Sequence, residues 1–115
     1  MPDRLGYKVR LQHIIDAILA IESYTKGVTR EEFAESSMMF NATLRQLEIM
    51  GEAANRLSEN ILTTHDEVPW ARIIGLRNMV IHEYFGIDDK MIWNIIQYNI
   101  PPFKASVLAI LLEII

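Results

Sequence analysis

The chain has 115 residues, half of them hydrophobic, which suits one small domain over residues 1–115 with a core of its own. It contains no cysteine, which excludes disulfides, thiolate catalysis and cysteine-ligated zinc. Its net charge of −4 disfavours non-specific binding to nucleic acid, because Lys and Arg must neutralise phosphates, so any contact with RNA has to use a local basic site.

The ends of the sequence carry no targeting signal that we recognise. The first ten residues lack the apolar core of a signal peptide. The most apolar stretch, at the C-terminus, is short and is interrupted by Pro101 and Pro102. We therefore expect a cytoplasmic protein without a membrane-spanning segment.

Apolar residues recur at helical spacing along nearly the whole chain, and no segment alternates as a strand does. The first helix is predicted over Tyr7–Lys26, and Thr29 begins a capping box that opens a short second helix. A long helix is predicted over Ser37–Asn60. Gly51 lies in its apolar seam and costs about 1 kcal/mol relative to Ala, so we expect another backbone to pack closely there.

The second half continues in the same way. Leu62 to Val68 is predicted to be a loop, and Pro69 to be the first residue of the next helix, which Gly86 ends. Asp88 is a candidate N-cap for the helix that follows.

The last predicted break is at the proline pair. Pro101 or Pro102 should end that helix and begin a final one to Ile115. The fold class is therefore all-α, an up-and-down bundle of four or five main helices.

Arg77 is the anomaly of the helix after Pro69. On a helical wheel it falls in the middle of an arc formed by Trp70, Ile73, Ile74, Val80 and Ile81. Arginine is almost never fully buried without a partner. We therefore expect Arg77 to have a carboxylate partner, or to face a cleft or a second subunit. Glu48 and Glu52 on the long helix are the candidates, and Glu48 is preferred because it lies nearer the apolar seam.

Asn78 and His82 are four residues apart, so one helix presents a guanidinium, an amide and an imidazole along one edge. His13, His65 and His82 lie on separate segments and form no known metal motif, so no metal or cofactor is expected. Histidine with arginine suits metal-independent RNA cleavage, in which imidazole moves protons and guanidinium stabilises the charged transition state. One histidine is too few for both an acid and a base, which favours a two-fold dimer.

Each residue also has a simpler interpretation when it is taken alone. His82 can bond a backbone carbonyl at the helix end, Arg77 can belong to a structural ion pair, and Tyr84 can pack in the core. Glu48 and Glu52 can form a solvated face. His13 and His65 are interpreted as ordinary surface or core residues.

Arg77 to Tyr84, with the sequence RNMVIHEY, resembles the R-x4-H-x-Y signature of the HEPN superfamily, specifically the HepT-like (DUF86) toxins. Residues 47–58, LEIMGEAANRLS, resemble the long central helix of that family. Residues 68–78 resemble its lead-in to the motif, and residues 82–88 its exit. The similarity therefore covers nearly the whole chain.

The resemblance implies an all-helical protein that dimerises through the motif helix and acts as a metal-independent endoribonuclease on tRNA or mRNA. Arg77 and His82 would be catalytic with Asn78 in support. The system would be a type VII toxin–antitoxin pair, whose antitoxin is an MntA-like nucleotidyltransferase that transfers AMP to Tyr84. The alternative is a non-catalytic module that binds a nucleotide or docks the nucleotidyltransferase. A third interpretation is a structural helical dimer in which Arg77 only pairs with Glu48.

Overall fold

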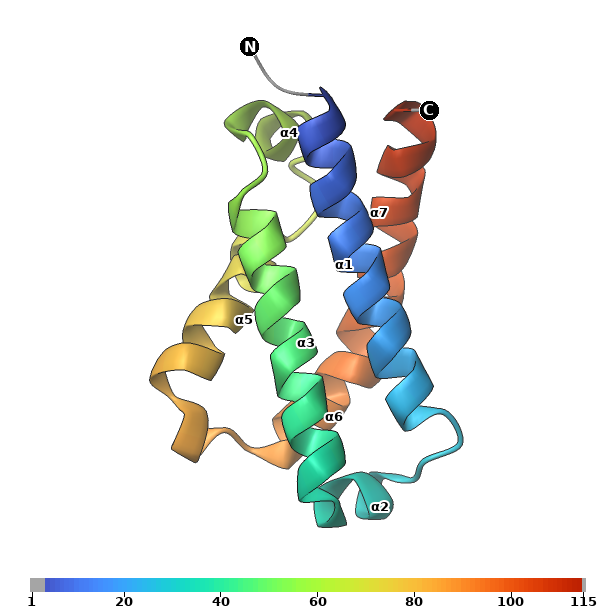
Figure 1. The fold of residues 1–115 in the computed structure, drawn as a ribbon, viewed down its shortest axis with the longest axis vertical. Coiled ribbons are helices and arrows are strands. Elements are labelled where there is room, and N and C mark those ends of the chain that lie inside the picture. Colours follow the sequence, from blue (N-terminus) through green and yellow to red (C-terminus); the bar gives the residue numbers. More distant parts are fainter. Residues whose placement is uncertain (1–3, 115) are drawn as a thin grey trace.

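The computed structural model describes residues 4–114, which form helices and turns without any strand, so the all-α prediction is confirmed. The long helices run alternately down and up, so that the first one begins and the last one ends at the same end of the bundle (Figure 1). The helices are α1 (Arg4–Thr25), α2 (Arg30–Glu35), α3 (Ser37–Asn55), α4 (Glu59–Thr64), α5 (Trp70–His82), α6 (Asp89–Asn94) and α7 (Ile100–Ile114).

The turn between α1 and α2 contains a left-handed glycine and the predicted capping box. Gly27 has a φ of +72°, the left-handed conformation that commonly follows a helix. The capping box is present, because the Glu32 backbone N–H donates to Thr29 Oγ1 at 3.1 Å and the Thr29 N–H donates to Glu32 Oε1 at 2.9 Å. These hydrogen bonds hold the pKa of Glu32 below its ordinary value.

The long helix is shorter than predicted. It ends at Asn55 instead of Asn60, and α4 occupies Glu59–Thr64, so the predicted loop from Leu62 to Val68 is partly wrong. The cause is Ser58, whose hydroxyl accepts a hydrogen bond from the Ile61 N–H and caps a new helix. A helical pattern that crosses such a cap cannot distinguish one helix from two.

The motif helix also ends earlier than its sequence suggests. α5 begins at Trp70, directly after Pro69, and His82 is its last residue. Tyr84–Gly86 forms a separate 3₁₀ turn. Asp88 then caps α6 as predicted, with its carboxylate accepting from the Lys90 N–H.

The predicted break at Pro101 and Pro102 is wrong. The chain passes from α6 into α7 through a π-helical turn, Ile95–Asn99, in which the Ile100 N–H donates to the Ile95 carbonyl. Pro101 and Pro102 have no backbone N–H to donate. The wider π turn just before them changes which backbone carbonyls need a donor, so the helix can continue. The resulting helix, Asp89–Ile114, is long and apolar enough to cross a membrane by length and composition, although the prolines were expected to prevent this.

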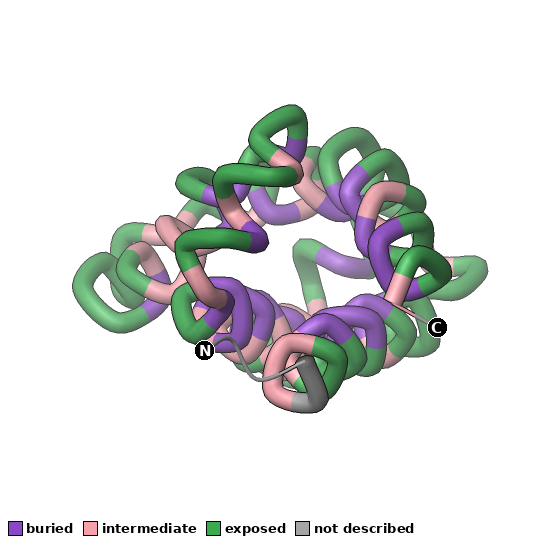
Figure 2. The backbone as a smooth tube through the Cα atoms, turned by 90° about the horizontal axis from the view of Figure 1, so that it is seen from above, coloured by how far each residue is buried: buried purple, intermediate pink, exposed green. Residues whose placement is uncertain are grey.

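The core lies between the helices, where the buried residues face inward (Figure 2). α1, α3 and the α6–α7 helix supply most of it, including Leu11, Ile14, Ile18, Leu44, Leu47, Met50, Ile92, Val107 and Ile110. α3 packs against both α1 and α5. The helix that carries the motif is therefore positioned mainly by α3.

Candidate functional site

Gly51 is the point of closest approach between α3 and α5. A Cβ atom at this position would lie 2.7 Å from the backbone N of Arg77 and 2.8 Å from the carbonyl O of Ile73. Only glycine allows this distance without a shift of the backbone. The prediction that Gly51 admits a close backbone is confirmed, and the contact places Arg77 directly over α3.

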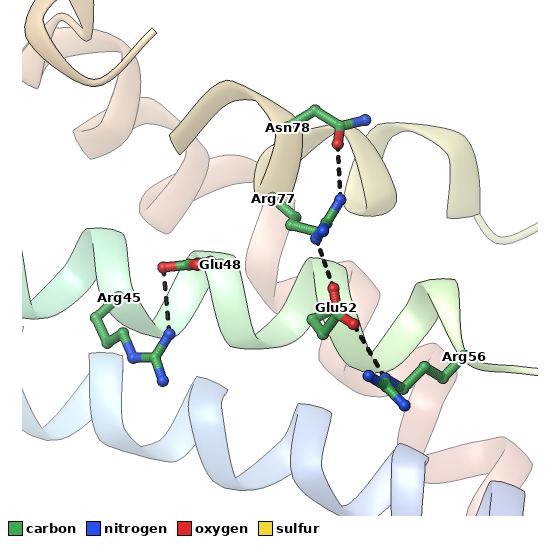
Figure 3. A network of polar contacts seen from close by, with 6 residues as sticks. All are labelled: Arg45, Glu48, Glu52, Arg56, Arg77 and Asn78. Atoms are coloured by element: carbon green, nitrogen blue, oxygen red, sulfur yellow. Dashed lines mark hydrogen bonds and ion pairs between the residues drawn. The ribbon is translucent and has the colours of Figure 1, made fainter. Parts of the chain in front are cut away.

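Arg77 has the carboxylate partner that its apolar surroundings required, but the partner is Glu52. The Arg77 Nε lies 2.5 Å from Glu52 Oε2, and its Nη1 donates to Asn78 Oδ1 at 3.2 Å (Figure 3). The preference for Glu48 is wrong, because Glu48 pairs with Arg45 at 3.3 Å. Since Gly51 sits against the backbone of Arg77, the adjacent Glu52 is the carboxylate within reach.

Glu52 holds two arginines at once. Arg56 Nε donates to Glu52 Oε1 at 3.0 Å, while Arg77 binds the other oxygen. The pKa of Glu52 is lowered, first by the hydrogen bond from Arg56 and further by the positive charges of Arg77 and Arg56. Glu52 is therefore a charged anchor for Arg77 across the neutral pH range.

Asn78 and His82 lie on the exposed side of α5. Asn78 holds the guanidinium of Arg77 and makes no hydrogen bond to His82. Within residues 4–114, the His82 side chain has no hydrogen bond or ion pair. The simpler interpretation, an imidazole bonded to a carbonyl at the helix end, is therefore wrong for the described part of the chain.

Tyr84 stands in the 3₁₀ turn after α5, with 44% of its surface exposed, so it does not pack in the core. Its hydroxyl donates to Oδ1 of Asn41, near the beginning of α3. Its ring packs edge-on against the ring of Phe85, with 5.4 Å between the ring centroids, and Phe85 is fully exposed. The turn is thus fastened to α3 while its aromatic surface faces outward.

A cavity of about 290 Å³ opens beside Arg77 between α1, α3 and α5. Its walls carry residues that the sequence interpretation treated as ordinary or did not consider: Arg10, His13, Arg45 and Arg56. Arg10 and His13 lie on α1, Arg45 lies on α3, and Arg56 directly follows the end of α3. No spacing within one helix relates the two pairs, so the sequence offered little signal for this grouping.

A second cavity, of about 460 Å³, lies on the other flank of α5 and is mostly apolar, with Leu76, Met91, Ile95, Pro102 and Phe103 among its lining residues. His65 belongs to neither cavity, since it lies against Glu113 at 3.5 Å and Glu67 at 3.8 Å. Among the residues that the structure describes, no three His, Asp or Glu side chains are grouped to hold a metal ion.

Comparison with known proteins gives consistent matches. The family model described as "Ribonuclease HepT-like" matches residues 14–110. A Thermococcus cleftensis protein named "Probable ribonuclease HepT" is 34% identical over 88% of this chain and 92% of its own length. A Caldanaerobacter subterraneus protein named "Putative RNase" is 37% identical over 88% of this chain and 90% of its own length.

A Methanocaldococcus jannaschii protein, named for a gamma-glutamylcyclotransferase and a putative RNase, is 33% identical over 96% of this chain. This chain covers 50% of that protein, about half its length. No solved structure matches the chain.

Proposed function

This chain belongs to the HepT-like ribonuclease family, and from that premise we propose that it is a metal-independent endoribonuclease and the toxin of a type VII toxin–antitoxin pair. The observation that carries the proposal is the position of Arg77. Its guanidinium is held by Glu52 and Asn78 beside a basic cavity, and the unpaired His82 lies on the same helix. These two residue types can supply the proton transfer and the charge stabilisation that metal-free RNA cleavage uses.

The proposed reaction uses the 2′-hydroxyl of the RNA. Neutral His82 takes the proton from this hydroxyl as its oxygen bonds to the adjacent phosphorus. The bond from phosphorus to the 5′-oxygen breaks, and an imidazolium protonates that leaving oxygen. The products are a 2′,3′-cyclic phosphate and a free 5′-hydroxyl.

Arg77 is suited to bind the reacting phosphate. A guanidinium has five N–H donors. Arg77 directs Nε to Glu52 and one Nη1 hydrogen to Asn78, so three of the five remain available. Because two partners fix its plane, the guanidinium loses little conformational entropy when it binds phosphate. Asn78 therefore supports catalysis through Arg77.

A dimer would complete the site. Acid and base catalysis by histidine requires two imidazoles, and this edge of α5 presents one, His82. Ile81, Tyr84 and Phe85 expose apolar surface next to it, as a subunit interface does. A two-fold axis beside the motif helix would bring two His82 side chains and two Arg77 side chains together.

Tyr84 is the proposed regulatory residue. In AMP transfer from ATP, the Tyr84 oxygen bonds to the α-phosphorus, pyrophosphate leaves, and the tyrosine loses its proton. The donor would be the nucleotidyltransferase antitoxin. The added phosphate would repel the RNA backbone from the proposed catalytic site, which contains Arg77 and His82. Modification requires that Tyr84 release Asn41.

The reaction is tested with a labelled single-stranded RNA in EDTA and product ends mapped by mass spectrometry. We expect cleavage that leaves 2′,3′-cyclic phosphates. A 2′-deoxy nucleotide placed at the mapped site should abolish cleavage there. RNA binding without cleavage would contradict the proposal and favour the alternative of a non-catalytic nucleotide-binding or docking module.

The regulatory role is tested with Tyr84→Phe. This variant should cleave RNA at the normal rate and escape inhibition when the nucleotidyltransferase and ATP are added. Tyr98→Phe is the matched control, because Tyr98 is also exposed, and it should remain inhibited. If Tyr84→Phe is inhibited as fully as the native chain, Tyr84 is not the acceptor.

A further inference from the structure

We propose that the cavity between α1, α3 and α5, lined by Arg10, His13, Arg45, Arg56 and Arg77, binds an RNA backbone phosphate that neighbours the scissile one. The inference rests on the proposed ribonuclease function. It adds a substrate subsite that the R-x4-H-x-Y motif does not include, and it assigns Arg10 of α1 a direct role in binding.

The charges of the cavity are unusual for this chain. Four of the seven arginines in the sequence line it, against two carboxylates, Glu48 and Glu52. The formal charge of its walls is therefore +4 − 2 = +2, while the whole chain carries −4. An acidic protein that binds RNA needs one local basic site, and the cavity meets that requirement.

The ion pairs within the cavity leave cationic groups available. Arg45 and Arg56 pair with Glu48 and Glu52, but their side chains are 65% and 56% exposed. Exposed pairs of this kind contribute little to stability, so these guanidinium groups can turn to a phosphate at small cost. Arg10 is half-buried and has no ion pair within residues 4–114, which leaves its fork of donors free.

The cavity is continuous with the proposed catalytic edge through Arg77. Its guanidinium lies between Glu52, which lines the cavity, and Asn78 on the exposed side of α5 (Figure 3). Ile81, the residue before His82, also lines the cavity. A strand bound across Arg77 would therefore place one phosphate near His82 and a neighbouring phosphate toward Arg10 and Arg45.

The experiment measures binding of a fluorescein-labelled, single-stranded 2′-O-methyl oligoribonucleotide, which cannot be cleaved because it lacks the 2′-hydroxyl. Arg10→Gln should weaken binding about tenfold, as the loss of a hydrogen bond between charged groups does. The slope of log K against log salt should decrease in magnitude by about 0.7. The matched control is Lys8→Gln, which removes the same charge from an exposed position two residues earlier on α1 and should change Kd less than twofold.

A second variant has the opposite expected sign. Glu48→Gln removes a carboxylate from the cavity wall and frees Arg45. It should tighten binding about fivefold, because repulsion between the carboxylate and phosphate is removed. Glu35→Gln, at an exposed position outside the cavity, is its control. Arg10→Lys should retain most of the affinity, which shows that a loss in Arg10→Gln reflects charge and not folding.

The outcomes separate this inference from the proposed function. If the native chain binds the oligonucleotide and Arg10→Gln weakens binding, but natural RNA is not cleaved, the cavity stands as a site for RNA phosphate and the ribonuclease proposal fails. If RNA is cleaved but Arg10→Gln and Glu48→Gln bind like their controls, the cavity is a structural ion-pair cluster and the inference is overturned. It is also overturned if the native chain does not bind.

Discussion

The two sides of α5 differ in how many of their side chains find partners within this chain. The side against α3 is fixed by two contacts, the backbone packing at Gly51 and the pair of Arg77 with Glu52. The opposite side and the turn after it carry His82 and Phe85, which are exposed and make no polar contact within residues 4–114. Arg77 on the first side and His82 on the second belong to one motif of eight residues, Arg77 to Tyr84.

The comparison distinguishes a residue that this chain positions by itself, Arg77, from a residue that a second subunit would have to complement, His82. The group that would stabilise charge in the transition state is oriented by its own chain, as electrostatic preorganisation requires. The imidazole of His82, which would transfer protons, has no polar partner within residues 4–114 and lies beside exposed apolar side chains. This arrangement is what a composite site predicts, since a second subunit can complete only the side that the first leaves free.

The largest effect is expected from Arg77→Ala. RNA cleavage should fall about 100- to 1000-fold, the loss typical when one donor to the transition state is removed. The fold should persist, because Glu52 keeps its hydrogen bond with Arg56. Cleavage rates are compared with those of Arg72→Ala, an exposed arginine on the same helix. Equal rates in the two variants would contradict the assignment of Arg77.

The fixed side is tested by two glycines with opposite expected effects. Gly51→Ala should lower the free energy of unfolding by about 1–3 kcal/mol, because the methyl group would meet the α5 backbone. Gly75→Ala should raise it by up to about 1 kcal/mol, since Gly75 is inside α5 and a Cβ there meets nothing within 4 Å. Urea unfolding measures both. Similar changes in the two variants would mean that the packing at Gly51 does not position α5.

The open side is tested by Phe85→Asp. If the exposed ring lies in a subunit interface, this change should raise the dimer dissociation constant at least about tenfold, which corresponds to about 1.4 kcal/mol. Leu112→Asp, at another exposed apolar position on α7, is the control and should leave the constant unchanged. Sedimentation equilibrium gives both constants. A native chain that is monomeric at all concentrations would contradict the proposal that two subunits form the site.

The smallest effect is a dependence of stability on pH. Because the pKa of Glu52 is lower in the folded chain than its ordinary value of 4.5, the unfolded chain takes up this proton first as pH falls. The stabilisation is complete above about 4.5 and is lost as pH falls through the lowered folded value. Solvent screening at this exposed carboxylate keeps the effect small. Glu52→Gln should flatten the acid side of the stability curve measured by urea unfolding, whereas Glu35→Gln should not.

Much of the fixed side could be predicted from the sequence. Gly51 in an apolar seam and Arg77 in an apolar arc are local anomalies, and each indicated a contact that the structure contains. The preference for Glu48 over Glu52 was wrong, because the choice depends on where two helices cross. The basic cavity was missed for the same reason, since Arg10 and Arg45 meet only after α1 and α3 pack.

The errors in the fold arose where a short-range feature competes with a long helical pattern. Ser58 caps a new helix inside an apolar periodicity that continues through it. The sequence predicts that Pro101 and Pro102 break the helix, yet the π turn at Ile95–Asn99 lets the helix continue. Neither result changes the motif, whose helix begins directly after Pro69.

The most direct test of the central claim is the rate of RNA cleavage in EDTA by His82→Ala. If His82 moves the protons, the rate should fall at least about 100-fold, with RNA affinity and unfolding free energy unchanged. His65→Ala should cleave at the normal rate, because His65 lies against Glu113, outside both cavities. Cleavage that persists in a pure His82→Ala preparation, at a rate near that of the native chain, would contradict the account.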